Sequence, residues 1–223
     1  MGASRRVSQA FFVFWFLMPQ YEALVIGIGN ILWADEGFGV RAVEAYHKKF
    51  SEDRRVRVID GGTLGAYLIN EVMDAKRILI FDCCDFKDKP GTLKLLKNGD
   101  IALWSSTKIS AHQAGMNDVL VMAALEGYEP QAISVIGVQP LELNDYGGSL
   151  TETVAQRIDE ALCLAEKELS SWGLEPRLRD QNETAEPLED ETLERDSYEK
   201  GRPSEKEAFR LGDLRFIVKE QTR

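Results

Sequence analysis

Residues 23–30 read Ala-Leu-Val-Ile-Gly-Ile-Gly-Asn, and this stretch decides the fold of the chain. A continuous apolar run that stops at Gly29 and Asn30 is typical of a strand buried on both faces of a parallel sheet. Asp35 follows at the position of a helix N-cap, ahead of apolar residues at helical spacing that extend to Tyr46. The sequence therefore predicts a buried strand, a short loop and a helix.

The same alternation continues along the chain. A second strand at 56–59 stops at Asp60 and two glycines, a helix is expected over 64–73, and a third strand over 77–81 ends at Asp82. Strand, helix, strand, helix, strand is typical of a parallel sheet with right-handed crossovers.

The second half of the domain adds to this sheet. We expect an edge strand at 92–96, a last strand at 132–138, and helices over 112–125 and 150–169. The predicted fold class is therefore α/β, with a single domain and a mostly parallel sheet that carries helices on both faces.

Composition divides the chain into three parts. We expect residues 1–20 to lie outside the fold, residues 21–174 to form the α/β domain, and residues 175–223 to form a disordered acidic tail. The apolar run at 10–18 is too short to span a bilayer and no small-residue cleavage site follows it, so we interpret it as an extension that precedes a true start at Met18.

The prediction of a disordered tail depends on its charge. Residues 180–199 hold nine acidic residues and one arginine, with almost no apolar periodicity. Such a segment cannot bury enough apolar surface to offset the entropy that ordering costs.

Charge and cysteine content exclude several classes of protein. The net charge of −10 argues against nucleic-acid binding, which needs clustered lysine and arginine. Three cysteines, two of them adjacent, form neither a disulfide framework nor a CxxC zinc pattern. We therefore expect a monomer in the reducing cytoplasm, with no nucleic-acid or membrane partner.

Acidic residues follow three successive predicted strands. Sites in an open parallel sheet form beyond the carboxyl ends of the strands, so Glu36, Asp60 and Asp82 are expected at one edge. Asp82 is the hardest to explain structurally, because a carboxylate after four apolar residues is costly to desolvate without a cation or donors. Taken alone, Glu36 is better explained as an anion in the first turn of a helix. Turn chemistry explains Asp60 as well as a functional role does, and Asp35 is expected to cap the helix and fix the loop that presents Glu36.

The chain has only two histidines. His47, next to two lysines on a predicted helix, is expected to be solvated. His112 follows Ser110 at a predicted helix start, where the positive helix end disfavours imidazolium and keeps a ring nitrogen free for a metal. A histidine in that position is more often ordinary than a ligand. Together with Glu36 and Asp82, however, it predicts a site for a borderline divalent ion such as nickel or zinc, with positions open for a substrate.

These motifs resemble those of the hydrogenase maturation endopeptidases. The opening signature is Gly-Ile-Gly-Asn-Ile-Leu-Trp-Ala-Asp-Glu-Gly-Phe-Gly-Val-Arg at 27–41. The next motifs, in the order of that family, are Asp-Gly-Gly-Thr at 60–63, Phe-Asp at 81–82, Pro-Gly-Thr at 90–92, Lys-Ile-Ser-Ala-His-Gln at 108–113 and Gly-Val-Gln-Pro at 137–140. The resemblance covers residues 22–170, and its first motif is similar to the branch that serves uptake nickel–iron hydrogenases.

The resemblance implies a five-stranded twisted sheet and an endopeptidase, of aspartic or metal-dependent type. Such an enzyme removes the C-terminal extension of a hydrogenase large-subunit precursor after nickel insertion. The family's metal-binding residues fall on Glu36, Asp82 and His112, and its aspartate before two glycines falls on Asp60. The precursor would contribute the nickel, and Glu36, Asp60 and Asp82 are the expected catalytic groups.

Two other classes remain open at this point. A non-catalytic, nickel-sensing chaperone of hydrogenase assembly would use the same three ligands without cutting. A nucleotide-binding module is disfavoured because Leu32 takes the place of the third glycine of a dinucleotide motif, and no P-loop lysine motif is present. The absence of a nucleophile elbow leaves no persuasive Ser-His-Asp triad.

Overall fold

The computed structural model describes residues 19–101, 104, 111–180 and 182–201, apart from the side chains of residues 98 and 111–114. Five strands form one sheet in the order β2-β1-β3-β5-β4. The strands are β1 (Ala23–Ile28), β2 (Val56–Gly62), β3 (Arg77–Cys83), β4 (Leu93–Lys97) and β5 (Ala132–Val138). All neighbouring pairs are parallel except β4, which runs antiparallel to β5 at one edge. The predicted mostly parallel five-stranded sheet is confirmed.

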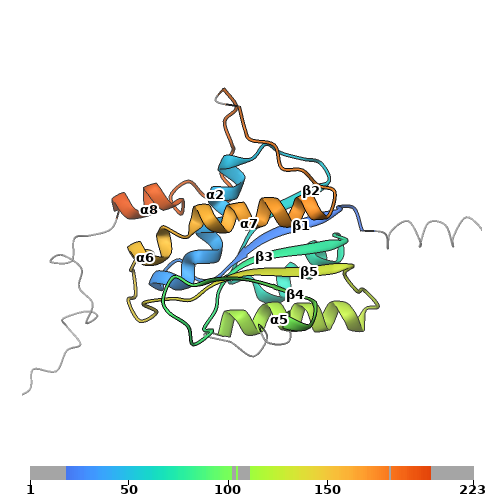
Figure 1. Ribbon diagram of the computed structural model, residues 1–223, viewed down its shortest axis with the longest axis horizontal. Coiled ribbons are helices and arrows are strands. Elements are labelled where there is room, and N and C mark those ends of the chain that lie inside the picture. The colour runs from blue at the N-terminus through green and yellow to red at the C-terminus, as the bar shows by residue number, and fades with distance from the viewer. Residues whose placement is uncertain (1–18, 102–103, 105–110, 181, 202–223) are drawn as a thin grey trace, which may run out of the picture.

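Helices cover both faces of this sheet (Figure 1). Helices α2 (Phe38–Lys49) and α7 (Ile158–Ser171) lie on one face, and α3 (Ile69–Met73) and α5 (Ala111–Leu125) lie on the other. The short elements are η1 (Ala34–Gly37), η2 (Gly65–Leu68), η3 (Asn98–Asp100), α6 (Glu152–Ala155) and α8 (Arg195–Gly201). No helix in the described part of the chain is long and apolar enough to cross a membrane.

The core consists of two layers, one on each side of the sheet. All six residues of β1 are buried, as the unbroken apolar run predicts. Ala23 and Val25 join the cluster that includes α2 and α7, whereas Leu24 and Ile26 join the cluster that includes α3 and α5. This alternation follows from the two-residue period of a strand.

Glycines bring the start of α2 close to the carboxyl ends of β1 and β3. A Cβ atom on Gly27 would lie 2.1 Å from the carbonyl oxygen of Gly39, and one on Gly39 would lie 2.2 Å from that of Ile28 and 2.3 Å from that of Phe81. Only a residue without a side chain fits at this approach. The helix therefore begins directly above the strand ends, and η1 contacts β3.

The boundaries of two helices differ from those that the sequence predicts. The helix predicted over 64–73 begins as the 3₁₀ segment η2 and continues as α3, and the helix predicted over 150–169 is divided into α6 and α7. Apolar spacing locates such helices but does not detect a break of two or three residues within them.

Residues 175–201 correct the prediction of a disordered tail for that part of the chain. Leu178 forms an antiparallel bridge with Phe50, and the Ser51 amide donates to the Arg177 carbonyl at 2.8 Å. The segment then runs past α2 and ends in α8 (Figure 1). Composition misjudged it because backbone hydrogen bonds and charge pairs, together with Leu188 packed on the core, hold it in place. The rest of the expected tail, 202–223, and the extension 1–18 lie outside the described residues.

Candidate functional site

Asp82 is buried at the carboxyl end of β3. Its side chain is 1% exposed and continues the alternation of Ile78 and Ile80, which pack toward α5. Its Oδ1 accepts a hydrogen bond from the Cys83 amide at 2.8 Å, and its Oδ2 accepts one from the Trp104 indole at 2.8 Å. Donors on both oxygens allow the carboxylate to be buried and hold it in one orientation.

Glu36 lies in η1, in the loop that follows β1. Its side chain is 8% exposed, and its buried Oε1 has no hydrogen-bond partner among the described residues. A buried carboxylate oxygen without a donor is costly, so an oxygen of this kind is suited to receive a cation or a donor from a bound partner.

The two cysteine thiols at the end of β3 lie near several carboxylates. Burial raises the pKa of the Cys83 thiol well above its ordinary range, and Asp82, Asp35 and Glu36 raise it further. Burial and Asp82 raise the pKa of the Cys84 thiol in the same way. Both thiols therefore stay protonated at neutral pH, and neither has the character of a nucleophilic thiolate. That Glu36 and Asp82 meet at one rim stays a prediction.

His112 is the second residue of α5. The predicted helix start is confirmed, but the His112 side chain lies outside the described residues, so its role as a ligand stays a prediction. Within the described part of the chain, no three His, Cys, Asp or Glu side chains gather as metal ligands. A donor set of Glu36, Asp82 and His112 depends on a side chain beyond that part.

Asp35 is not the helix cap that the sequence suggested, because neither η1 nor α2 has a side-chain cap. The side chain is fully buried and accepts four hydrogen bonds, from the amides of Leu141, Glu142 and Thr151 and from the Thr151 hydroxyl, at 2.7–3.0 Å. Asp35 therefore ties η1 to the loop between β5 and α6. These contacts agree with the expectation that Asp35 fixes the loop that presents Glu36. They differ from a helix cap, in which the side chain would accept from the amides of its own helix.

Asp60 occupies different surroundings from Asp82. Asp60 is in register with Gly27 of β1, and Gly27 is in register with Phe81 of β3. Residues in register point to the same face, so Asp60 lies on the α2 face with Phe81. Asp82, the next residue of β3, points to the α5 face. Burial raises the pKa of Asp60 to about 6, the Gly62 amide lowers it, and Glu189 raises it. The strand ends bring Asp60 to the predicted edge, but on the opposite side of the sheet from Asp82.

Trp104 is the residue of the site that the sequence did not indicate. It is 2% exposed and lies in the apolar cluster of the α5 face, where it contacts Asp82. A tryptophan between a predicted edge strand and a predicted helix has no distinctive spacing, so no sequence signal could have identified it.

Comparison with known proteins decides the family. A sequence profile described as hydrogenase maturation protease matches residues 40–168, a range that contains Asp60, Asp82 and His112. This chain belongs to the hydrogenase maturation protease family. It is therefore a peptidase, as the motifs had indicated.

Individual relatives of this hydrogenase maturation protease agree. The hydrogenase expression/formation protein HupD of Rhodobacter capsulatus is 46% identical over 204 residues, which cover 90% of this chain and 96% of HupD. HoxM of Azotobacter vinelandii is 43% identical over 201 residues, with the same coverage of both chains. The solved hydrogenase maturating endopeptidase HybD of Escherichia coli matches with a TM-score of 0.67 and 34% identity, over 71% of this chain and 98% of HybD.

Proposed function

We propose that this maturation protease removes the C-terminal extension of a nickel–iron hydrogenase large-subunit precursor after nickel has been inserted. We further propose that it recognises the nickel that the precursor carries. The name of HybD, a hydrogenase maturating endopeptidase, supports the first part. The proposed location is the cytoplasm, since the free thiols of Cys83, Cys84 and Cys163 suit a reducing compartment.

The nickel proposal is supported by the buried Oε1 of Glu36, which has no hydrogen-bond partner among the described residues, and by the buried Asp82 at the end of β3. Two carboxylates with one imidazole form a donor set that suits nickel. Glu36 and Asp82, with His112 from the start of α5, would contact the nickel of a loaded precursor. An empty precursor would lack these contacts and would be held less well.

Cleavage then needs a correctly placed peptide bond and a group that accepts a proton from water. The proposed role of Glu36, Asp82 and His112 is to orient the loaded precursor. A carboxylate at the same edge would hold the attacking water. The pKa of Asp60, about 6, suits a general base near neutral pH, but its place on the α2 face requires the substrate to reach that side of β2.

A processing assay tests the proposal. Purified protease is incubated with nickel-loaded and with nickel-free precursor, and the precursor mass is followed by gel and mass spectrometry. The proposal predicts shortening of the loaded precursor alone. Equal cleavage of both precursors would contradict nickel recognition. Binding of the loaded precursor without any shortening would instead identify a nickel-sensing chaperone.

A further inference from the structure

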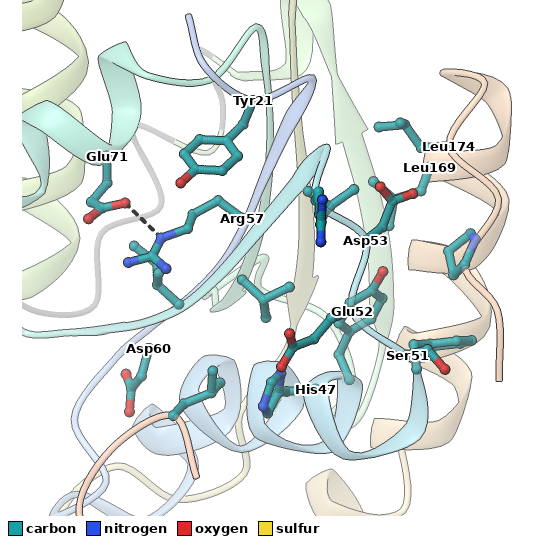
Figure 2. A pocket seen from close by; sticks show the side chains of 18 of the residues that line it. Tyr21, His47, Ser51, Glu52, Asp53, Arg57, Asp60, Glu71, Leu169 and Leu174 are labelled. Carbon is teal, nitrogen blue, oxygen red and sulfur yellow. Dashed lines mark hydrogen bonds and ion pairs between the residues drawn. The ribbon is translucent and has the colours of Figure 1, made fainter. Parts of the chain in front are cut away.

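A groove of about 1070 Å³ runs along the free edge of β2 (Figure 2), and Asp82 is not among its lining residues. β2 is the outermost strand of the sheet, so within the described residues no strand pairs with the other side of its backbone. The edge strand, the loop before it and residues 174–177 and 186–189 line this β2 groove. Unpaired backbone groups at a sheet edge are the usual point at which an extended segment adds a strand.

The floor of the β2 groove is apolar. Tyr46, Phe50 and Leu174 lie beneath it and are at most 5% exposed. At the rim, Leu64 and Tyr67 are 50% and 86% exposed, which is high for large apolar side chains. Exposed apolar side chains beside an unpaired strand edge provide contacts for the alternate side chains of an added strand.

The lining of the β2 groove is strongly acidic. Its acidic residues are Glu52, Asp53, Asp60, Glu71, Glu175, Glu186 and Glu189, against the arginines Arg54, Arg57 and Arg177 and one histidine, His47. Arg57 is already paired with Glu71 at 3.1 Å. A groove with this excess of negative charge attracts a basic segment and repels a second acidic copy of this chain, whose net charge is −10.

One wall of the groove comes from the segment that composition had assigned to a disordered tail. The His47 ring donates to the Glu186 carbonyl at 2.8 Å, and the Arg179 guanidinium donates to the carbonyl oxygens of His47 and Phe50. The HupD alignment covers 90% of 223 residues, so it cannot end before about residue 200. The structural match to HybD covers 98% of HybD but only 71% of this chain. The wall therefore lies within the part of this chain that aligns with HupD. A shorter part of this chain already matches almost the whole length of HybD.

We propose that the β2 groove binds an extended basic segment of a partner protein, which adds a strand to the free edge of β2. The open backbone edge supplies main-chain hydrogen bonds to the added strand. Alternate side chains of that strand point to opposite faces, so every second one contacts the apolar floor and rim. The side chains between them, lysines or arginines, pair with the acidic lining. Residues of both faces line the groove, such as Tyr46 on the α2 face and Leu68 on the α3 face, and Asp60 is among them. Glu36 and Asp82 are not lining residues, so the docking does not use them. The inference does not rest on the proposed proteolysis.

The test uses the full chain and a defined probe, a fluorescein-labelled twelve-residue peptide of alternating valine and lysine. Its binding is measured by fluorescence anisotropy and compared with that of the same peptide carrying glutamate in place of lysine. We expect the lysine peptide to bind at least about ten-fold more tightly, and the difference to shrink as salt is raised. Equal binding of both peptides, or no binding of either, would overturn the proposal.

Charge reversal locates the binding. The double variant Glu186→Lys and Glu189→Lys should weaken binding of the lysine peptide about ten-fold. The matched control Glu126→Lys and Glu129→Lys makes the same charge change between α5 and β5 and should leave binding within about two-fold. An equal loss in both variants would show non-specific attraction and would overturn the proposal.

Amide spectra test strand addition itself. In a ¹⁵N-labelled sample, the lysine peptide should shift the amide signals of Val58 and Asp60, on the edge strand, and leave those of β4 unchanged. Unchanged β2 signals would refute edge pairing. Two further results would show that the β2 groove has another occupant and would refute edge pairing with a partner protein. One is a dimer in sedimentation velocity, and the other is a set of β2 shifts that appear only after residues 1–18 are deleted.

Discussion

The indole N–H of Trp104 donates a 2.8 Å hydrogen bond to the carboxylate of Asp82, and both side chains are at least 98% buried. The other oxygen of Asp82 accepts from the Cys83 amide. The Cys84 thiol also donates to Asp82, at 3.5 Å, so donors next to β3 and the indole of a distant segment orient this carboxylate. Trp104 acts on the site through Asp82, as a positioning residue.

Replacing Trp104 with phenylalanine tests this relationship. Trp104→Phe keeps a buried aromatic ring but removes the donor, so the free energy of unfolding should fall by about 1–3 kcal/mol. Cleavage of the loaded precursor should slow as well, because Asp82 loses one of the donors that orient its carboxylate. Urea unfolding and processing rates measure the two effects. Trp172→Phe, on the opposite face of the sheet, is the control, and equal loss of processing in both variants would contradict the positioning role.

Asp35 should be among the most sensitive positions of the fold. Asp35→Ala removes the buried acceptor for four hydrogen bonds and leaves three backbone amides and a hydroxyl without their partner, so we expect a loss of about 3 kcal/mol or more in unfolding free energy. Hydrogen exchange at the Leu141 and Thr151 amides should become fast. Asn144→Ala, an exposed change in the same loop, should change neither quantity. Retained protection at Thr151 in Asp35→Ala would disprove the anchoring role.

Asp60 gives the protein a pH dependence with a defined sign. Burial raises its pKa from 3.8 to about 6, so between these values the folded chain keeps a proton that the unfolded chain releases. Stability contributed by this group is therefore lost as pH rises through that window, by at most about 3 kcal/mol. Asp60→Asn removes the titration, so its stability relative to the wild type should rise between pH 4.5 and pH 7.5.

Urea unfolding at a series of pH values measures this difference. Asp118→Asn, an exposed change on α5, is the control and should show a stability difference that does not vary with pH. A difference between Asp60→Asn and the wild type that stays constant over the same range would mean that Asp60 titrates normally.

Much of the fold could be predicted because buried parallel strands carry unbroken apolar runs. The strand expected at 132–138 has the bounds of β5, and the run at 23–28 has those of β1. The segment 175–201 could not be predicted, because its order depends on contacts with α2. An example is the hydrogen bond from Arg41 to the Leu193 carbonyl, which joins residues 152 positions apart.

The candidate site could be predicted in part for a related reason. The end of a strand determines the edge at which a residue lies, and Asp82 lies buried at the end of β3 as expected. The face of the sheet to which a side chain points depends instead on the register between strands. That register pairs Asp60 with Gly27 and places Asp60 on the opposite face from Asp82. Register is a tertiary property, and the sequence of one strand does not contain it.

The most direct test of the nickel proposal is the processing of nickel-loaded precursor by His112→Ala and Glu36→Gln. Glu126→Gln, an exposed change just after the C-terminal end of α5, is the control. Both site variants should cleave at least about 100-fold more slowly than the wild type. Their circular dichroism and urea midpoints should match those of the control. Cleavage by His112→Ala at the wild-type rate would contradict the claim that this histidine, Glu36 and Asp82 together recognise the nickel of the precursor.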